Sequence, residues 1–70
     1  MELYKVDFIN NVPERAVVVS KGYYKELTKV EKLGDQLFLK WLYVHADHEN
    51  DAMKSADRYK NAILNQVRCN

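Results

Sequence analysis

The sequence predicts an α+β fold, a small antiparallel sheet packed against one C-terminal helix. Three observations predict it: alternating apolar and polar residues over 3–9, a dense apolar run over 36–46, and a helical apolar repeat from residue 48 onward. The chain has 70 residues, which suffices for one domain, residues 1–70, with one modest core.

Residues 3–20 are expected to form a β-hairpin. Residues 3–9 place Tyr4, Val6 and Phe8 on one side, the period of two of a half-buried strand. Residues 10–13 supply turn chemistry, because asparagine tolerates positive φ and proline cannot donate to a ladder. The β-branched Val17 to Val19 favour a second strand over 15–20, which leaves a sheet edge open unless a further strand covers it.

Residues 21–34 fit two structures. Tyr23, Leu27, Val30 and Gly34 fall at helical spacing, with Gly34 suited to a helix C-terminus. Alternatively, residues 33–36 form a two-residue hairpin turn and residues 23–33 hold a fourth strand. In that register Lys29 faces Lys40, an unfavourable pair. The sequence therefore favours the short helix and leaves the strand open.

Residues 36–46 are expected to form the third strand, and they are apolar on both faces. Regular alternation places one set, Leu37, Leu39, Trp41 and Tyr43, opposite a second set, Phe38, Leu42, Val44 and Ala46. Such a strand is covered on both sides or meets a partner. A helical stripe over 37, 38, 41, 42 and 45 is the alternative, which would make the second half a helical hairpin.

The last element is expected to be a helix over about 48–67, with Asp47 as its N-cap. Its apolar stripe predicts Tyr59 and Ile63 at the centre of the contact with the sheet, flanked by Ala56 and Val67.

Composition excludes several classes of protein. The net charge is +1, so the whole chain has no bias towards nucleic acid or anionic lipid. No apolar stretch approaches the roughly 20 residues that span a bilayer, so no membrane association is expected. Cys69 is the single cysteine and Met1 is followed directly by Glu2, without an apolar signal segment, which favours a cytoplasmic location.

No pattern in the sequence supports catalysis or metal binding. The residues of ligand type cluster at His45, Asp47, His48 and Glu49, but their spacing matches no ligand motif and the acids have a role at the helix start. Ser20 and Ser55 lack a glycine elbow, and Gly22 and Gly34 form no phosphate loop. We therefore expect no enzyme activity, no metal and no cofactor.

The surplus of apolar and aromatic residues predicts a protein-binding module. One helix covers one face of a small sheet, so the second face or an open edge would bind another protein or a second copy of the chain. The candidate partner-binding residues are Leu39, Trp41, Tyr43, Tyr23 and Tyr24. Alternatively, residues 21–34 fold over that face and bury it.

A second hypothesis is a small nucleic-acid-binding regulator. Lys54, Arg58 and Arg68 lie on the polar face of the expected helix and could contact phosphates. Tyr23, Tyr24 or Trp41 could stack on bases. Asp57 interrupts this basic face, which weakens the hypothesis.

The build of the chain, rich in lysine, asparagine and tyrosine with a short sheet and a terminal helix, resembles small accessory proteins of bacteria and tailed phages. No motif is specific to one such family. The resemblance implies a regulatory or inhibitory protein that binds and modulates a larger protein.

Overall fold

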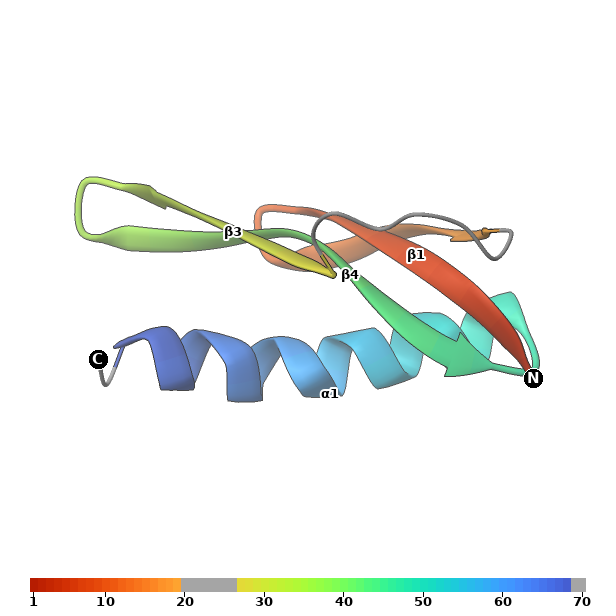
Figure 1. The fold of residues 1–70 in the computed structure, drawn as a ribbon. Helices are drawn as coiled ribbons and strands as arrows, with labels where there is room; N and C mark the ends of the chain where they lie inside the picture. Colours follow the sequence, from red (N-terminus) through yellow and green to blue (C-terminus); the bar gives the residue numbers. More distant parts are fainter. Residues whose placement is uncertain (20–26, 69–70) are drawn as a thin grey trace.

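The computed structural model describes residues 1–19 and 27–68, which form a four-stranded sheet and one helix. The strands are β1 (Glu2–Ile9), β2 (Val12–Val18), β3 (Thr28–Leu33) and β4 (Gln36–Ala46), and the helix is α1 (Glu49–Arg68). All pairs are antiparallel in the order β2-β1-β4-β3, and α1 lies along one face of the sheet (Figure 1). The α+β prediction is confirmed.

The first hairpin forms as expected, with a tighter turn. Ile9 pairs with Val12, which leaves Asn10 and Asn11 as the two turn residues, at φ 53° and 64°. Two positive φ values define a type I′ turn, whose twist matches that of the strands, and asparagine tolerates them. β2 begins at Val12 rather than residue 15, because Pro13 is compatible with an edge strand and pairs with Phe8.

The second hairpin corrects the preference for a short helix. Residues 28–33 form strand β3, and residues 20–26 lie outside the described residues. Leu33 pairs with Gln36, so Gly34 and Asp35 form a two-residue turn in which Gly34 has φ 63°. A positive-φ glycine serves a helix end and a hairpin turn equally, so Gly34 could not decide between them.

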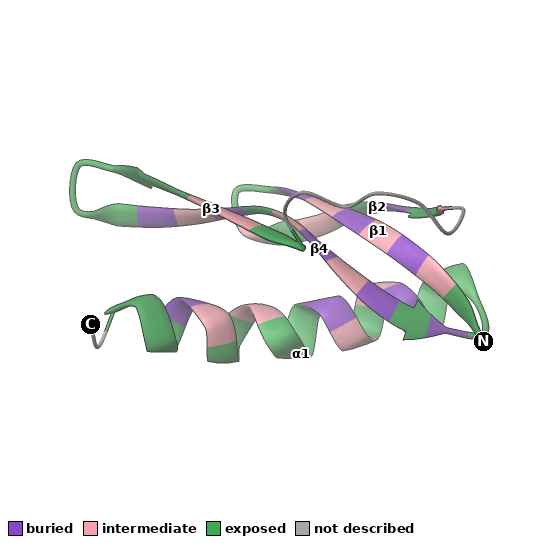
Figure 2. Ribbon diagram, in the orientation of Figure 1, coloured by how far each residue is buried: buried purple, intermediate pink, exposed green. Residues whose placement is uncertain are grey.

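The core lies between the sheet and the small residues of α1 (Figure 2). Ala52 and Ala56 are fully buried and Leu64 nearly so. The expectation for Tyr59 was wrong, since it is 55% exposed, and Val67 is also exposed, whereas Ile63 is partly buried against the core. The alanines let the helix backbone approach the sheet, which moves the centre of contact onto them and leaves Tyr59 on the flank.

A β-bulge at Lys40 sets the register of β4. Continuous pairing from the turn would place Lys29 opposite Lys40, but Lys29 pairs with Trp41 and Val30 with Leu39. Lys40 is thus the extra residue of the bulge. The repulsive pair is avoided, and the Lys40 Nζ atom lies 3.9 Å from the Glu31 Oε2 atom.

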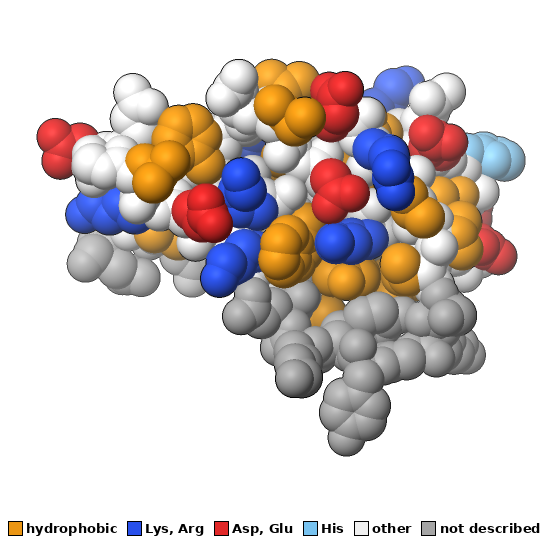
Figure 3. Space-filling model, turned by 90° about the horizontal axis from the view of Figure 1, so that it is seen from above, with side chains coloured by type: hydrophobic (Ala, Val, Ile, Leu, Met, Phe, Trp, Pro, Cys, Tyr) orange, Lys and Arg blue, Asp and Glu red, His pale blue; other side chains and the backbone are white. Residues whose placement is uncertain are grey.

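The bulge also decides which side chains of β4 face the helix. Leu37 and Leu39 before it are buried with the core residues after it, Leu42, Val44 and Ala46. Phe38, Trp41 and Tyr43 are half-buried and belong to the opposite face of the sheet, which Figure 3 views. Regular alternation, which grouped Leu39 with Trp41, was therefore wrong across Lys40.

The helix start differs by one residue from the expected position. The backbone N–H of Ala52 donates to the His48 carbonyl at 3.0 Å, so His48 takes the N-cap position assigned to Asp47. Asp47 precedes it, and its Oδ1 atom lies 3.8 Å from the amino group of Met1. Glu49 and Asp51 in the first turn complement the helix dipole.

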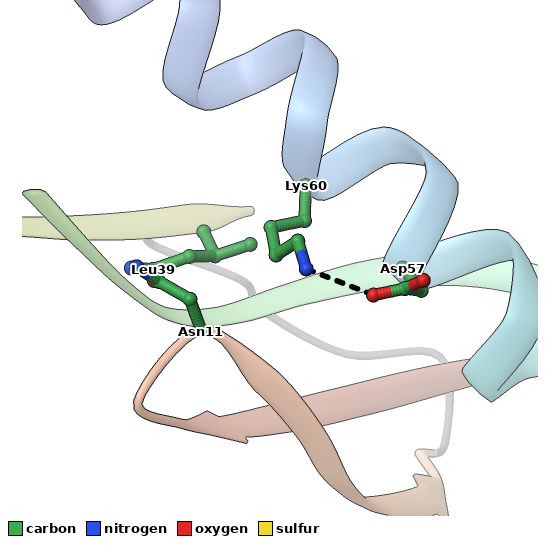
Figure 4. A network of polar contacts seen from close by, with 4 residues as sticks. All are labelled: Asn11, Leu39, Asp57 and Lys60. Carbon is green, nitrogen blue, oxygen red and sulfur yellow. Dashed lines mark hydrogen bonds and ion pairs between the residues drawn. The ribbon is translucent and has the colours of Figure 1, made fainter.

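Asn11 joins the two hairpins. β1 pairs with β4 only over residues 41–46, so the first half of β4 lacks this neighbour. The Asn11 Nδ2 group donates to the Leu37 carbonyl at 2.9 Å, and the Leu39 N–H donates to Asn11 Oδ1 at 2.8 Å. Figure 4 shows Asn11 at the hairpin tip, turned towards β4 at Leu39. The side-chain amide thus bonds β4 as a peptide group of a neighbouring strand would.

We expect Leu64→Ala to lower the free energy of unfolding by about 2 to 5 kcal/mol, because it removes a buried side chain from the helix–sheet contact. Asn65→Ala, on the exposed neighbouring position, should change it by no more than about 0.5 kcal/mol. Urea unfolding measures both. Equal losses would mean that α1 is covered on both sides.

We expect Asn11→Gly to cost about 1 to 3 kcal/mol in urea unfolding, since it keeps the positive φ but removes two hydrogen bonds. Asn10→Gly is the matched control, because the Asn10 side chain is exposed and glycine suits its φ. A loss at Asn10 as large as that at Asn11 would contradict the bridging role of the Asn11 amide.

Candidate functional site: the outer face and the β2 edge

The outer face is the face of the sheet opposite α1, and the strand register arranges it in rows. One row runs from Val17 through Lys5 to Tyr43. The next runs from Arg15 through Asp7 and Trp41 to Lys29. Beyond the bulge, Glu31 pairs with Phe38. Hydrophobic and charged side chains are therefore interspersed across this face (Figure 3).

Lys5 and Trp41 form the centre of the outer face. The Lys5 Nζ atom lies over the Trp41 ring, 4.6 Å from its centroid, and 3.5 Å from the Asp7 Oδ1 atom. A cation–π contact of this kind contributes about 0.5 to 1 kcal/mol at an exposed site. The predicted apolar sheet face is thus a mixed surface, in which a cation covers the tryptophan.

The β2 edge is the outer side of strand β2, where no described strand pairs with it. The consecutive residues Val17 and Val18 are 38% and 49% exposed. Val17 belongs to the outer face, whereas Val18 pairs with the core residue Tyr4 and belongs to the helix side. Because they point to opposite faces, their shared exposure is a property of the edge.

The five candidate partner-binding residues do not form one surface. Leu39 is 1% exposed in the core, so it belongs to the helix–sheet contact. Trp41 and Tyr43 lie on the outer face. Tyr23 and Tyr24 lie outside the described residues.

The basic residues of the helix lie away from Trp41. Lys54, Arg58 and Arg68 are exposed on α1, and Arg68 lines a hollow with Leu37 of β4, whereas Trp41 belongs to the outer face, on the side of the sheet opposite α1. Arg68 follows Arg58 by ten residues, about 15 Å along the axis. Trp41 therefore cannot stack on a nucleotide held by Lys54 and Arg58.

The ligand-type residues of the β4–α1 junction do not converge. Within residues 1–19 and 27–68, no three or more His, Cys, Asp or Glu side chains are grouped to hold a metal ion.

A groove of about 460 Å³ lies between β4 and α1, with Leu42, Val44 and Ile63 among its lining residues and His45, Ser55 and Tyr59 as polar ones. No helix in the described part of the chain is long and apolar enough to cross a membrane.

Sequence reasoning anticipated an open sheet edge but did not single out two features of these surfaces. The exposure of Val17 and Val18 was signalled by a β-branched run in a strand with a neighbour on one side only. The cluster of lysines around Trp41 had no sequence signal, because Lys5, Lys29 and Lys40 come from three strands and one of them depends on the bulge.

Comparisons with known proteins identify no relative. No protein-family model matches the chain, and neither a curated protein nor a solved structure matches it.

The bulge predicts different outcomes for two single deletions in β4. Deleting Lys40 leaves Leu39 facing the helix and Trp41 facing outward in a regular ladder. The free energy of unfolding should therefore fall by no more than the contribution of the two Asn11 hydrogen bonds, about 1 to 3 kcal/mol. Deleting Phe38 either turns Leu37 to the outer face or turns Lys40 into the core. The free energy of unfolding should then fall by at least about 2 kcal/mol more than in the Lys40 deletion. Urea unfolding of the two variants, which have equal length, measures the difference. Equal stabilities would contradict the assignment of Lys40 as the extra residue.

Proposed function

We propose that this protein is a non-enzymatic interaction module that binds a larger protein by adding an extended segment of that protein to the β2 edge. The observation that carries the proposal is the paired exposure of Val17 and Val18 on an edge strand. A regulatory or inhibitory role fits a small chain that occupies a segment of a larger partner.

The backbone of β2 supplies the hydrogen-bonding groups for such pairing. The Val19 N–H donates to the Leu3 carbonyl at 2.9 Å, which fixes the direction of the ladder. In an antiparallel pair the direction alternates, so Val17 faces β1 while Ala16 and Val18 direct their N–H and C=O groups away from the sheet. These groups are placed to bond a strand added from outside.

The two edges of the sheet differ in how they are protected. β3 has Lys29, Glu31 and Lys32 among its six residues, and charged side chains on an edge discourage pairing. β2 has Pro13, Glu14 and Arg15 in its first half but only Ala16, Val17 and Val18 in its second. The second half of β2 is therefore the favoured docking segment.

A substitution of the backbone donor tests the proposal. Val18→Pro removes an outward N–H without removing a bond to β1, whereas Val18→Thr keeps this N–H and the β-branched shape. In affinity capture from the native host, we expect wild type and Val18→Thr to retain the same protein and Val18→Pro to lose it.

Urea unfolding of each variant shows whether the fold survives the substitution. Retention of the partner by folded Val18→Pro would exclude strand addition at β2. Failure of wild type to retain any protein would contradict the interaction module itself.

A further inference from the structure

Aromatic side chains from one strand gather on the outer face. Phe38, Trp41 and Tyr43 all belong to β4 and are each half-buried, on the face of the sheet opposite α1. Trp41 and Tyr43 occupy successive outward positions, about 7 Å apart along a strand. Rings in such a row form a platform on which successive unpaired bases can stack.

Cationic side chains outnumber acidic ones around this platform. Among the described residues, the four cations Lys5, Arg15, Lys29 and Lys40 stand against the three acids Asp7, Glu14 and Glu31, a surplus of one positive charge. Asp7 lies 3.5 Å from Lys5, and Glu31 lies 3.9 Å from Lys40. The face therefore complements an anionic ligand, while the whole chain stays close to neutral.

We propose that the outer face binds single-stranded nucleic acid, with bases stacked on Trp41 and its aromatic neighbours and phosphates paired with the surrounding lysines. This site borders the β2 edge, since Arg15 and Val17 of β2 belong to the outer face, but it does not depend on the protein-binding proposal. It also differs from the basic face of α1, because there the cations lie on α1, whereas Trp41 belongs to the side of the sheet opposite α1.

The position of Lys5 suggests how a base would enter. Its Nζ atom lies over the Trp41 ring, where a base would stack. Base stacking on an aromatic ring is generally the stronger of the two contacts. An arriving base therefore displaces the ammonium group, which then becomes available to a phosphate beside it.

Trp41 is the single tryptophan, so its fluorescence reports stacking directly. The probe is a thymidine oligonucleotide of about 12 nucleotides, within the usual site size of such proteins. We expect saturable quenching of Trp41, with affinity about twentyfold weaker at 200 mM than at 50 mM salt for roughly three phosphate contacts. A blunt duplex of the same length should bind more weakly, because its bases cannot stack on the rings.

Matched charge reversals locate the site. By anisotropy of the labelled oligonucleotide, Lys29→Glu and Lys40→Glu should each weaken binding about tenfold, whereas Lys54→Glu and Arg58→Glu on α1 should change it less than twofold. Trp41→Phe should retain most of the affinity and Trp41→Leu should lose about tenfold, with urea unfolding to confirm that each variant is folded.

Three results would overturn the proposal. The first is that the oligonucleotide does not bind at about 50 mM salt, where non-specific affinity is strongest. The second is that only the α1 variants lose affinity for it. The third is that a polyglutamate peptide binds as tightly as the oligonucleotide and does not quench Trp41. The last result would assign the face to an acidic protein.

Discussion

The structure depends on the bulge at Lys40, because β4 pairs with two different strands in different stretches while its buried side chains pack towards the helix in both stretches. β4 pairs with β3 from Gln36 to Leu42 and with β1 from Trp41 to Ala46. One extra residue between these stretches keeps Leu37, Leu39 and Leu42 on the helix side. Without the extra residue, side chains would alternate regularly along β4, and the apolar residues on one side of Lys40 would point away from the helix and into solvent.

Two further sets of contacts hold β4 in place between the helix and the neighbouring strands. The two fully buried alanines of α1 allow the helix to approach the sheet closely, and the Asn11 amide bonds the part of β4 that β1 does not reach. In a chain of this size the net stability is only a few kcal/mol, so each of these contacts is a large fraction of it.

Local patterns in the sequence predicted most of the fold. Alternation in β1, the asparagine-rich turn, the length of β4 and the helical repeat after Asp47 were each read from neighbouring residues. The fourth strand was left open because Gly34 suits a helix end and a turn alike. The faces of β4 could not be predicted past Lys40, since a bulge is set by pairing with a strand elsewhere in the chain. The candidate site was predicted less well than the fold. Regular alternation grouped Leu39 with Trp41, and the lysines around Trp41 become neighbours only when three strands assemble.

The topology also constrains the order of folding. The β1–β2 and β3–β4 hairpins close over two-residue turns, and hairpins of this kind form in about 1 to 10 μs. The β1–β4 ladder joins residues 34 to 44 positions apart, from Asp7 and Trp41 to Glu2 and Ala46. The loop-closure entropy opposes the ladder before it gains any hydrogen bond, so we expect docking of two preformed hairpins to be the slow step of folding. Asn11, at the tip of one hairpin and bonded to the strand of the other, is placed to lower the barrier to that docking.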